Sequence, residues 1–131
     1  MVMELWMVLA SVGILVAGIG FQAVVGTADN GSARQLGPRD DYGQPSTLAG
    51  RGERAVRNQV ESLVMFVPVI MVAQLADVHT AMTVLGAQIF VISRVFYMPL
   101  YWLGVPILRT IAFTGGVVGM LMILTAIVQA A

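Results

Sequence analysis

Four long apolar stretches decide what this chain can fold into. They cover residues 2–26, 52–76, 80–101 and 106–129. The hydrocarbon core of a bilayer is about 30 Å thick, and a helix needs roughly 20 apolar residues to cross it. Each stretch reaches that length, so the sequence predicts four membrane-spanning helices. We expect the first span to be retained, because its apolar run is too long for a signal peptide and its early charge is the acidic Glu4.

The composition agrees with a membrane protein. Charged residues make up 11% of the chain, hydrophobic residues make up 58%, and the mean hydropathy is +0.86. A soluble domain carries about 25% charged residues to cover its surface. The composition therefore excludes a soluble monomer, a disordered tail and a basic nucleic-acid binder. The chain has no Cys, so we expect no disulfide and no thiolate metal site. The nine Met residues are interpreted as packing residues, and we expect no metal.

The connections between the stretches define the predicted architecture. Residues 77–79 alone join the second stretch to the third, which requires an antiparallel helical hairpin. Residues 27–50 are rich in Gly, Pro, Asp, Asn and Ser and show no helical period, so they predict a surface loop. The predicted fold is an all-α, antiparallel up-and-down transmembrane four-helix bundle, with residues 1–131 forming one domain.

The basic residues lie on one side of the predicted bundle. The chain has seven Arg and no Lys, and neither terminus nor the 77–79 turn contains an Arg. Cytoplasmic segments of membrane proteins are enriched in Lys and Arg, so we predict a cytoplasmic 27–50 loop and external termini. In the external turn, Asp77 is interpreted as a turn residue, and His79 is interpreted as a solvated residue.

The second span opens with polar residues on one helical face. Arg54, Asn58 and Glu61 are spaced by four and three, and Arg57 lies beside this face. An ionisable group in mid-span costs about 2.5–3.5 kcal/mol, so such groups usually point into the bundle and serve a function. Arg54 and Glu61 are about 10 Å apart along the axis, which suits an elongated zwitterion. In the alternative interpretation, the Arg side chains extend to the lipid headgroups and Glu61 pairs with Arg94 or Arg54.

A second polar face is predicted where the third span ends and the fourth begins. Arg94, Tyr97 and Tyr101 recur at spacings of three and four. Pro106 is tolerated at the first position of a helix, so Arg109 falls in the first turn of the fourth span, at the depth of Arg94 and Tyr101. Alternatively, the two Tyr residues belong to the interfacial aromatic belt, in which Trp102 is interpreted as an anchor.

These motifs resemble those of a known family. The run RAVRNQVE at residues 54–61 resembles the Arg-Ala-x-x-Asn-x-x-Glu signature of the MAPEG family, the membrane-associated proteins in eicosanoid and glutathione metabolism. The pattern Arg94-x-x-Tyr97-x-x-x-Tyr101, followed by Arg109-Thr110, resembles the bacterial branch of that family. The resemblance extends over nearly the whole chain, and it implies a bacterial inner-membrane protein.

The resemblance implies a homotrimer that binds glutathione between neighbouring protomers. It implies that the ligand-binding residues are Arg54, Arg57, Asn58, Glu61, Arg94 and Tyr97. Arg54 and Asn58 would hold polar groups of the tripeptide, and Glu61 would hold its amino end. Arg94 and Tyr97 would hold the adjacent backbone or carboxylate. Tyr101 and Arg109 would lie near the thiol as the catalytic residues, with Arg109 stabilising the thiolate.

The implied function is a glutathione-dependent membrane transferase or peroxidase that acts on lipophilic electrophiles. Glutathione would be a cosubstrate, and membrane lipids and the lipophilic substrate would be the other partners. A different low-molecular-weight thiol is an alternative donor. A non-catalytic membrane subunit or scaffold that binds a lipid headgroup or another anion is the alternative function. A small transporter is less favoured, because the spans show no broken helices or inverted repeat.

Overall fold

The computed structural model describes all residues 1–131 and contains helices only. The long helices are α1 (Met3–Asn30), α3 (Thr47–Leu75), α4 (Ala81–Leu103) and α5 (Pro106–Ala130), and α2 (Ser32–Leu36) is a short helix between α1 and α3. Each of the four long helices is long and apolar enough to cross a membrane. The prediction of an all-α four-helix bundle is therefore confirmed.

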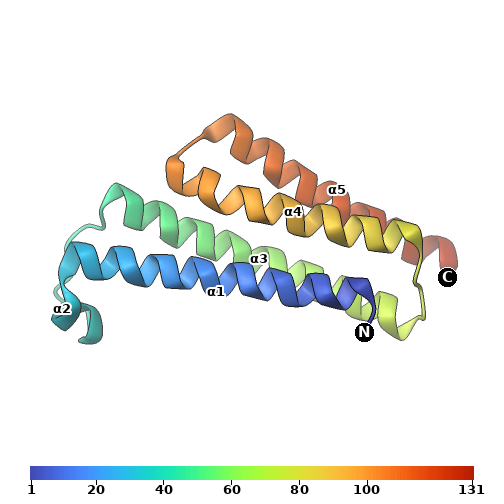
Figure 1. Cartoon of the computed structure of the whole chain (residues 1–131), viewed down its shortest axis with the longest axis horizontal. Coiled ribbons are helices and arrows are strands. Elements are labelled where there is room, and N and C mark those ends of the chain that lie inside the picture. Colours follow the sequence, from blue (N-terminus) through green and yellow to red (C-terminus); the bar gives the residue numbers. More distant parts are fainter.

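The helices form two antiparallel pairs (Figure 1). Helix α1 runs beside α3, and α4 runs beside α5, with the short 76–80 turn joining the pairs. We call the end of the bundle that holds α2 and the α4–α5 turn the loop end. The end that holds both termini and the 76–80 turn is called the terminal end. Because successive long helices alternate in direction, residues far apart in the sequence meet at the same end.

Helices α4 and α5 approach each other closely at two glycines. A methyl group on Gly119 would lie 2.5 Å from the carbonyl oxygen of Gly86, and one on Gly86 would lie 2.6 Å from the carbonyl oxygen of Gly119. Small residues let membrane helices approach until their backbones touch. Beside this contact, the rings of Phe66 and Phe90 stack with their centroids 4.0 Å apart and form the centre of the buried core.

The prediction of a loop without helix over residues 27–50 is wrong at both ends. Helix α1 continues to Asn30, because the side chains of Thr27 and Asn30 donate hydrogen bonds to the carbonyl oxygens of Ala23 and Gly26. The helix then stops at Gly31, whose φ of 80° favours glycine.

Helix α3 begins five residues earlier than the predicted second span, at Thr47. Its N-cap is Ser46, whose hydroxyl accepts a hydrogen bond from the amide of Ala49 at 3.2 Å. The Ser46 hydroxyl also donates to Asp29 near the end of α1. This contact joins the end of α1 to the start of α3 across the connection.

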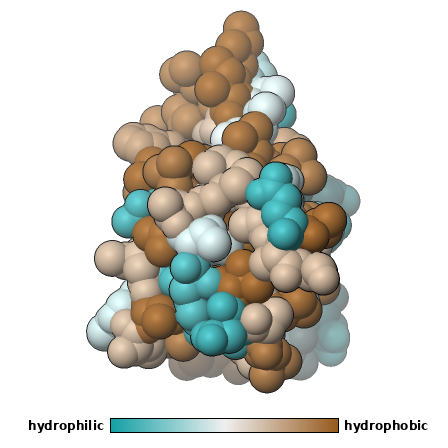
Figure 2. All heavy atoms as spheres, turned by 90° about the vertical axis from the view of Figure 1, so that its right-hand side faces the viewer, coloured by the Kyte–Doolittle hydropathy of each residue, from teal (hydrophilic) through white to brown (hydrophobic).

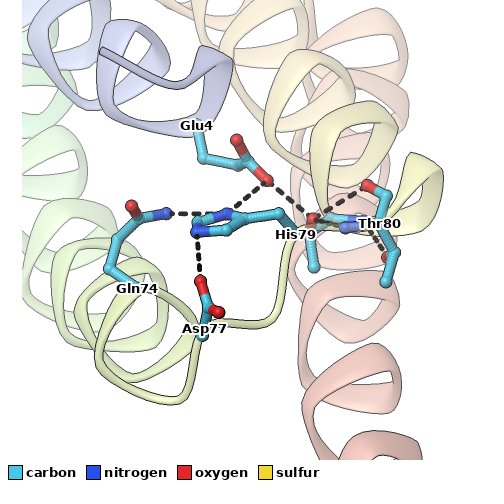
Figure 3. A network of polar contacts seen from close by, with 6 residues as sticks. Glu4, Gln74, Asp77, His79 and Thr80 are labelled. Carbon is cyan, nitrogen blue, oxygen red and sulfur yellow. Dashed lines mark hydrogen bonds and ion pairs between the residues drawn. The ribbon is translucent and has the colours of Figure 1, made fainter.

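At the terminal end, a polar cluster joins α1 to the 76–80 turn (Figure 3). The Glu4 carboxyl group is 1% exposed and accepts a hydrogen bond of 2.7 Å from the Thr83 hydroxyl. His79 Nδ1 lies 3.7 Å from the same Glu4 oxygen, and His79 Nε2 lies 3.6 Å from Asp77. His79 is exposed, as predicted, and its ring nitrogens lie close to the two carboxyl groups. Apart from such small polar groups, the surface of this end is mostly hydrophobic (Figure 2).

Candidate functional site

The side chain of Arg94 lies at the centre of the polar residues inside the bundle. It is 2% exposed. Its Nε donates a hydrogen bond of 2.9 Å to Gln59 Oε1, and its Nη2 donates one of 2.6 Å to Asn58 Oδ1. The guanidinium carbon lies 4.2 Å from the centroid of the Tyr97 ring. Arg94 makes no salt bridge with a carboxylate within 4.0 Å. The structure thus holds a buried cation with neutral amides and an aromatic face.

Sequence reasoning missed Gln59. This side chain is fully buried, and its Nε2 donates a hydrogen bond of 3.1 Å to the backbone carbonyl of Ser11 in α1. Gln59 follows Asn58 directly, so it points about 100° away from the polar face that Arg54, Asn58 and Glu61 define. The available signal was an amide side chain within a membrane span, where each buried polar group needs a partner.

A cavity of about 250 Å³ opens beside Arg94. Its lining comes from three helices and consists of Asn58, Tyr97, Tyr101, Arg109, Thr110 and Phe113. The rings of Tyr97 and Tyr101 meet edge to face at 5.6 Å, and the guanidinium carbon of Arg109 lies 4.7 Å from the centroid of the Tyr101 ring. The lining includes Arg109 and no Asp or Glu. Four residues singled out from the sequence therefore meet at one cavity, and Arg94 lies behind two of them.

The remaining predicted residues lie on the outside of this chain. Arg54, Arg57 and Glu61 are exposed on α3, so the expectation that they point into the protomer's own bundle is wrong. Arg57 pairs with Glu53 at 3.0 Å. The alternative pairing of Glu61 with Arg94 or Arg54 is absent, because no cation lies within 4.0 Å of Glu61. This face of α3 therefore carries three charged side chains within or beside an apolar span.

A larger cavity, of about 810 Å³, lies at the loop end between α1, the α2 segment and the start of α3. None of the residues predicted to bind a ligand or catalyse a reaction lines it, although Glu53, the partner of Arg57, does. Tyr42 donates a hydrogen bond of 2.6 Å to Gln35 across this region. The larger cavity is thus built mainly by the connection, and the candidate site is the smaller one.

The other basic residue near the site serves the packing of the loop end. Arg51 Nη1 donates a hydrogen bond of 3.3 Å to the backbone carbonyl of Trp102. The Trp102 ring stacks on Phe21 of α1 with the centroids 3.9 Å apart. These contacts connect α1, α3 and α4 close to the cavity. No group of three or more His, Asp or Glu side chains is arranged to hold a metal ion.

The fold and the site together define the class of the protein. The chain forms an up-and-down bundle of four helices, each long and apolar enough to cross a membrane. This architecture is that of an integral membrane protein. A model of the MAPEG family matches residues 1–129, and the chain belongs to this family. The family recognised from the motifs is thereby confirmed. No curated protein and no solved structure matches the chain.

Proposed function

We propose that the protein is a glutathione-dependent membrane transferase or peroxidase that acts on lipophilic electrophiles. Membership of the MAPEG family supports a membrane role related to glutathione. One observation carries the finer proposal: the cavity between α3, α4 and α5 presents Arg109, Tyr101 and Asn58 together, with the buried cation Arg94 behind them. A thiol ligand placed there meets a guanidinium at the point where the thiolate forms.

The chemistry follows from the charge of that cavity. A free thiol has a pKa of about 8.5 and is mostly protonated at neutral pH, while the thiolate is the nucleophile. The guanidinium of Arg109 is a cation, and in a poorly hydrated site it favours the anionic sulfur. The sulfur of glutathione then forms a bond to the electrophilic carbon, and the leaving group departs with the bonding electrons. Tyr101, stacked under Arg109, contributes a phenol beside the same sulfur.

The charged face of α3 supports assembly as a homotrimer, in keeping with a family whose proteins are generally oligomeric. Arg54, Arg57 and Glu61 are exposed in the single chain, and charged groups facing lipid tails are costly. A neighbouring protomer, with glutathione between the two, covers these side chains. In this arrangement Arg54, Arg57 and Asn58 hold the carboxylates and amides of the tripeptide, and Glu61 holds its ammonium group. Arg94 and Tyr97 support the adjacent part of the ligand from behind.

The orientation in the membrane follows from the positive charges. No Arg lies at either terminus or in the 76–80 turn of the terminal end, so we place the loop end in the cytoplasm and both termini outside, in a bacterial inner membrane. Glutathione then arrives from the cytoplasm, while the lipophilic substrate reaches the cavity from the bilayer. The water-soluble thiol and the lipid-soluble electrophile thus meet close to the turn between α4 and α5.

Calorimetry with glutathione tests the proposal on protein purified in detergent. The wild type is expected to bind glutathione, and Glu61→Gln is expected to weaken binding about tenfold, because one charge pairing with the ammonium group is lost. Asp40→Asn is the control, since Asp40 is an exposed carboxylate of the connection that lines neither cavity. Absence of binding by the wild type would refute glutathione use.

The size of the cavity favours a second candidate function. At about 250 Å³ in the single chain, it is smaller than most small-molecule pockets, which hold roughly 300–1,000 Å³. An anionic lipid headgroup fits such a space, and the protein would then be a non-catalytic membrane subunit. This candidate predicts that purified protein retains anionic lipid, that glutathione does not displace it, and that no thiol transfer occurs.

A further inference from the structure

We propose that Gln59 is a positioning residue that keeps the cavity selective for an anionic group. It holds the guanidinium of Arg94 without neutralising it, and Arg94 in turn fixes the orientation of the Asn58 amide. The inference rests on the proposed function in one respect, namely that the anion is the thiolate or a carboxylate of glutathione. Nothing in the motifs singled out Gln59, which never touches the cavity itself.

The hydrogen bonds of Arg94 determine which way the neighbouring amides face. A guanidinium has donors only, so each amide that faces Arg94 must present its oxygen. Gln59 Oε1 accepts from Arg94 Nε at 2.9 Å, which leaves Gln59 Nε2 to donate to the Ser11 carbonyl at 3.1 Å. This carbonyl belongs to the backbone of α1, so the helix fixes its direction. The Gln59 side chain is fully buried and bonded at both ends, so the position of Arg94 is fixed from α1.

Arg94 also fixes the orientation of the Asn58 side-chain amide. Its Oδ1 accepts from Arg94 Nη2 at 2.6 Å, so its amide nitrogen is the end that remains available. Asn58 lines the cavity and forms no side-chain bond other than the one to Arg94. The cavity is thus offered N–H donors by Asn58 on α3 and by Arg109 on α5. A ligand group with acceptors only, such as a carboxylate, a sulfonate or a thiolate, complements these donors.

Gln59 is neutral, and this neutrality preserves the positive charge of Arg94. An opposite charge beside Arg94 would cancel most of the field that a guanidinium exerts in a poorly hydrated interior. Arg94 makes no salt bridge, and no carboxylate lines the cavity. An amide at position 59 therefore supplies the required acceptor and leaves the positive charge uncancelled. A carboxylate of the same size at this position would supply the acceptor and cancel the charge.

This difference defines the experiment. Gln59→Glu keeps the shape and the bond to Arg94 but adds a negative charge, and Gln59→Met keeps the size but removes both bonds. Gln88→Glu and Gln88→Met are the matched controls, because Gln88 is a half-buried glutamine of α4 that does not line the cavity. All proteins are purified in detergent as their native oligomers. The readouts are glutathione affinity, the pH dependence of the ultraviolet absorbance of the bound thiolate, and thermal stabilisation by inorganic sulfate.

We expect Gln59→Glu to lower glutathione affinity about tenfold or more and to raise the apparent pKa of the bound thiol by about one unit. It should also abolish stabilisation by sulfate. Gln59→Met should lower the affinity with a smaller change in the thiol pKa, since the charge of Arg94 remains. The Gln88 variants should behave as the wild type. A shift in the thiol pKa separates an electrostatic role of Gln59 from a purely structural one.

Several outcomes decide the inference separately from the proposed function. If the wild type binds no glutathione but is stabilised by sulfate, and Gln59→Glu is not, the inference holds and glutathione use fails. If Gln59→Glu assembles and binds glutathione and sulfate as the wild type does, the inference is wrong. If Gln59→Glu fails to assemble, unchanged binding by Gln59→Met overturns it instead. If neither glutathione nor sulfate affects the wild type, both proposals are wrong.

Discussion

The guanidinium carbon of Arg109 lies 4.7 Å from the centroid of the Tyr101 ring. The two residues lie on either side of the sharp turn that joins α4 to α5. Gly104 makes this turn with a φ of 71°, and Pro106 starts α5. The ring holds the cation at the cavity wall through a cation–π contact. The turn between α4 and α5 thus places the proposed catalytic pair beside each other.

Replacement of Arg109 tests the catalytic assignment. We expect Arg109→Ala to lower the rate of thiol transfer to a lipophilic electrophile such as a chlorodinitrobenzene by about 10²-fold, because one preorganised donor to a developing anion has that worth. Arg109→Lys should retain part of the rate, since it keeps the charge but loses the planar contact with Tyr101. Size-exclusion chromatography shows whether the oligomer is intact. An unchanged rate in an intact Arg109→Ala oligomer would remove Arg109 from the mechanism.

The close contact between α4 and α5 predicts a strong effect of one added methyl group. Gly119→Ala places a Cβ 2.5 Å from the Gly86 carbonyl oxygen, so the helices must separate. We expect a loss of about 1–3 kcal/mol in the free energy of unfolding, as for other overpacked sites, and a lower midpoint in thermal denaturation. Gly13→Ala is the control, because no atom lies within 4 Å of its added Cβ. Equal midpoints for the two variants would contradict the observed packing.

The buried carboxyl group of Glu4 predicts a contribution to stability at the terminal end. Glu4→Ala leaves the Thr83 hydroxyl without its partner on α1, and we expect a loss of about 1–3 kcal/mol. Thr83→Val should cost more, because it also removes the bond that the Thr83 hydroxyl accepts from the Thr80 amide. In a double-mutant cycle the two losses should not add, because each substitution removes the same bond. Additive losses would show that the hydrogen bond contributes little.

The proposed homotrimer predicts the mass of the native assembly. One chain has a mass of 14.0 kDa, so a homotrimer has three times 14.0 kDa, or 42 kDa. Native mass spectrometry of protein released from detergent is expected to show this species. Glu61→Leu should leave the fold of each chain intact, because the Glu61 side chain is exposed in the protomer. A monomer or dimer in the wild type would count against the proposed trimer.

Helix existence and order could be predicted from the sequence, because the length of an apolar run alone decides whether it spans a bilayer. The helical parts of residues 27–50 could not, since they depend on side-chain bonds such as Thr27 to the Ala23 carbonyl. The position of Pro106 at the start of α5 agrees with the rule that proline is tolerated there.

The candidate site was predictable in part. Spacing places Arg94, Tyr97 and Tyr101 on one helical face, and the structure brings Tyr97 and Tyr101 to the cavity with Arg109. Spacing does not show which face of α3 is turned inward, so the exposure of Arg54, Arg57 and Glu61 was missed. The role of Gln59 was missed for a related reason, because its partner Ser11 lies on another helix and no local pattern connects them.

The bond between Glu4 and Thr83 has a consequence for how the protein is made. The two residues are 79 positions apart, so the ribosome must synthesise α1, the connection, α3 and the first turn of α4 before the carboxyl group finds its hydroxyl. This contact between α1 and α4 can therefore form only after the first turn of α4 has been synthesised.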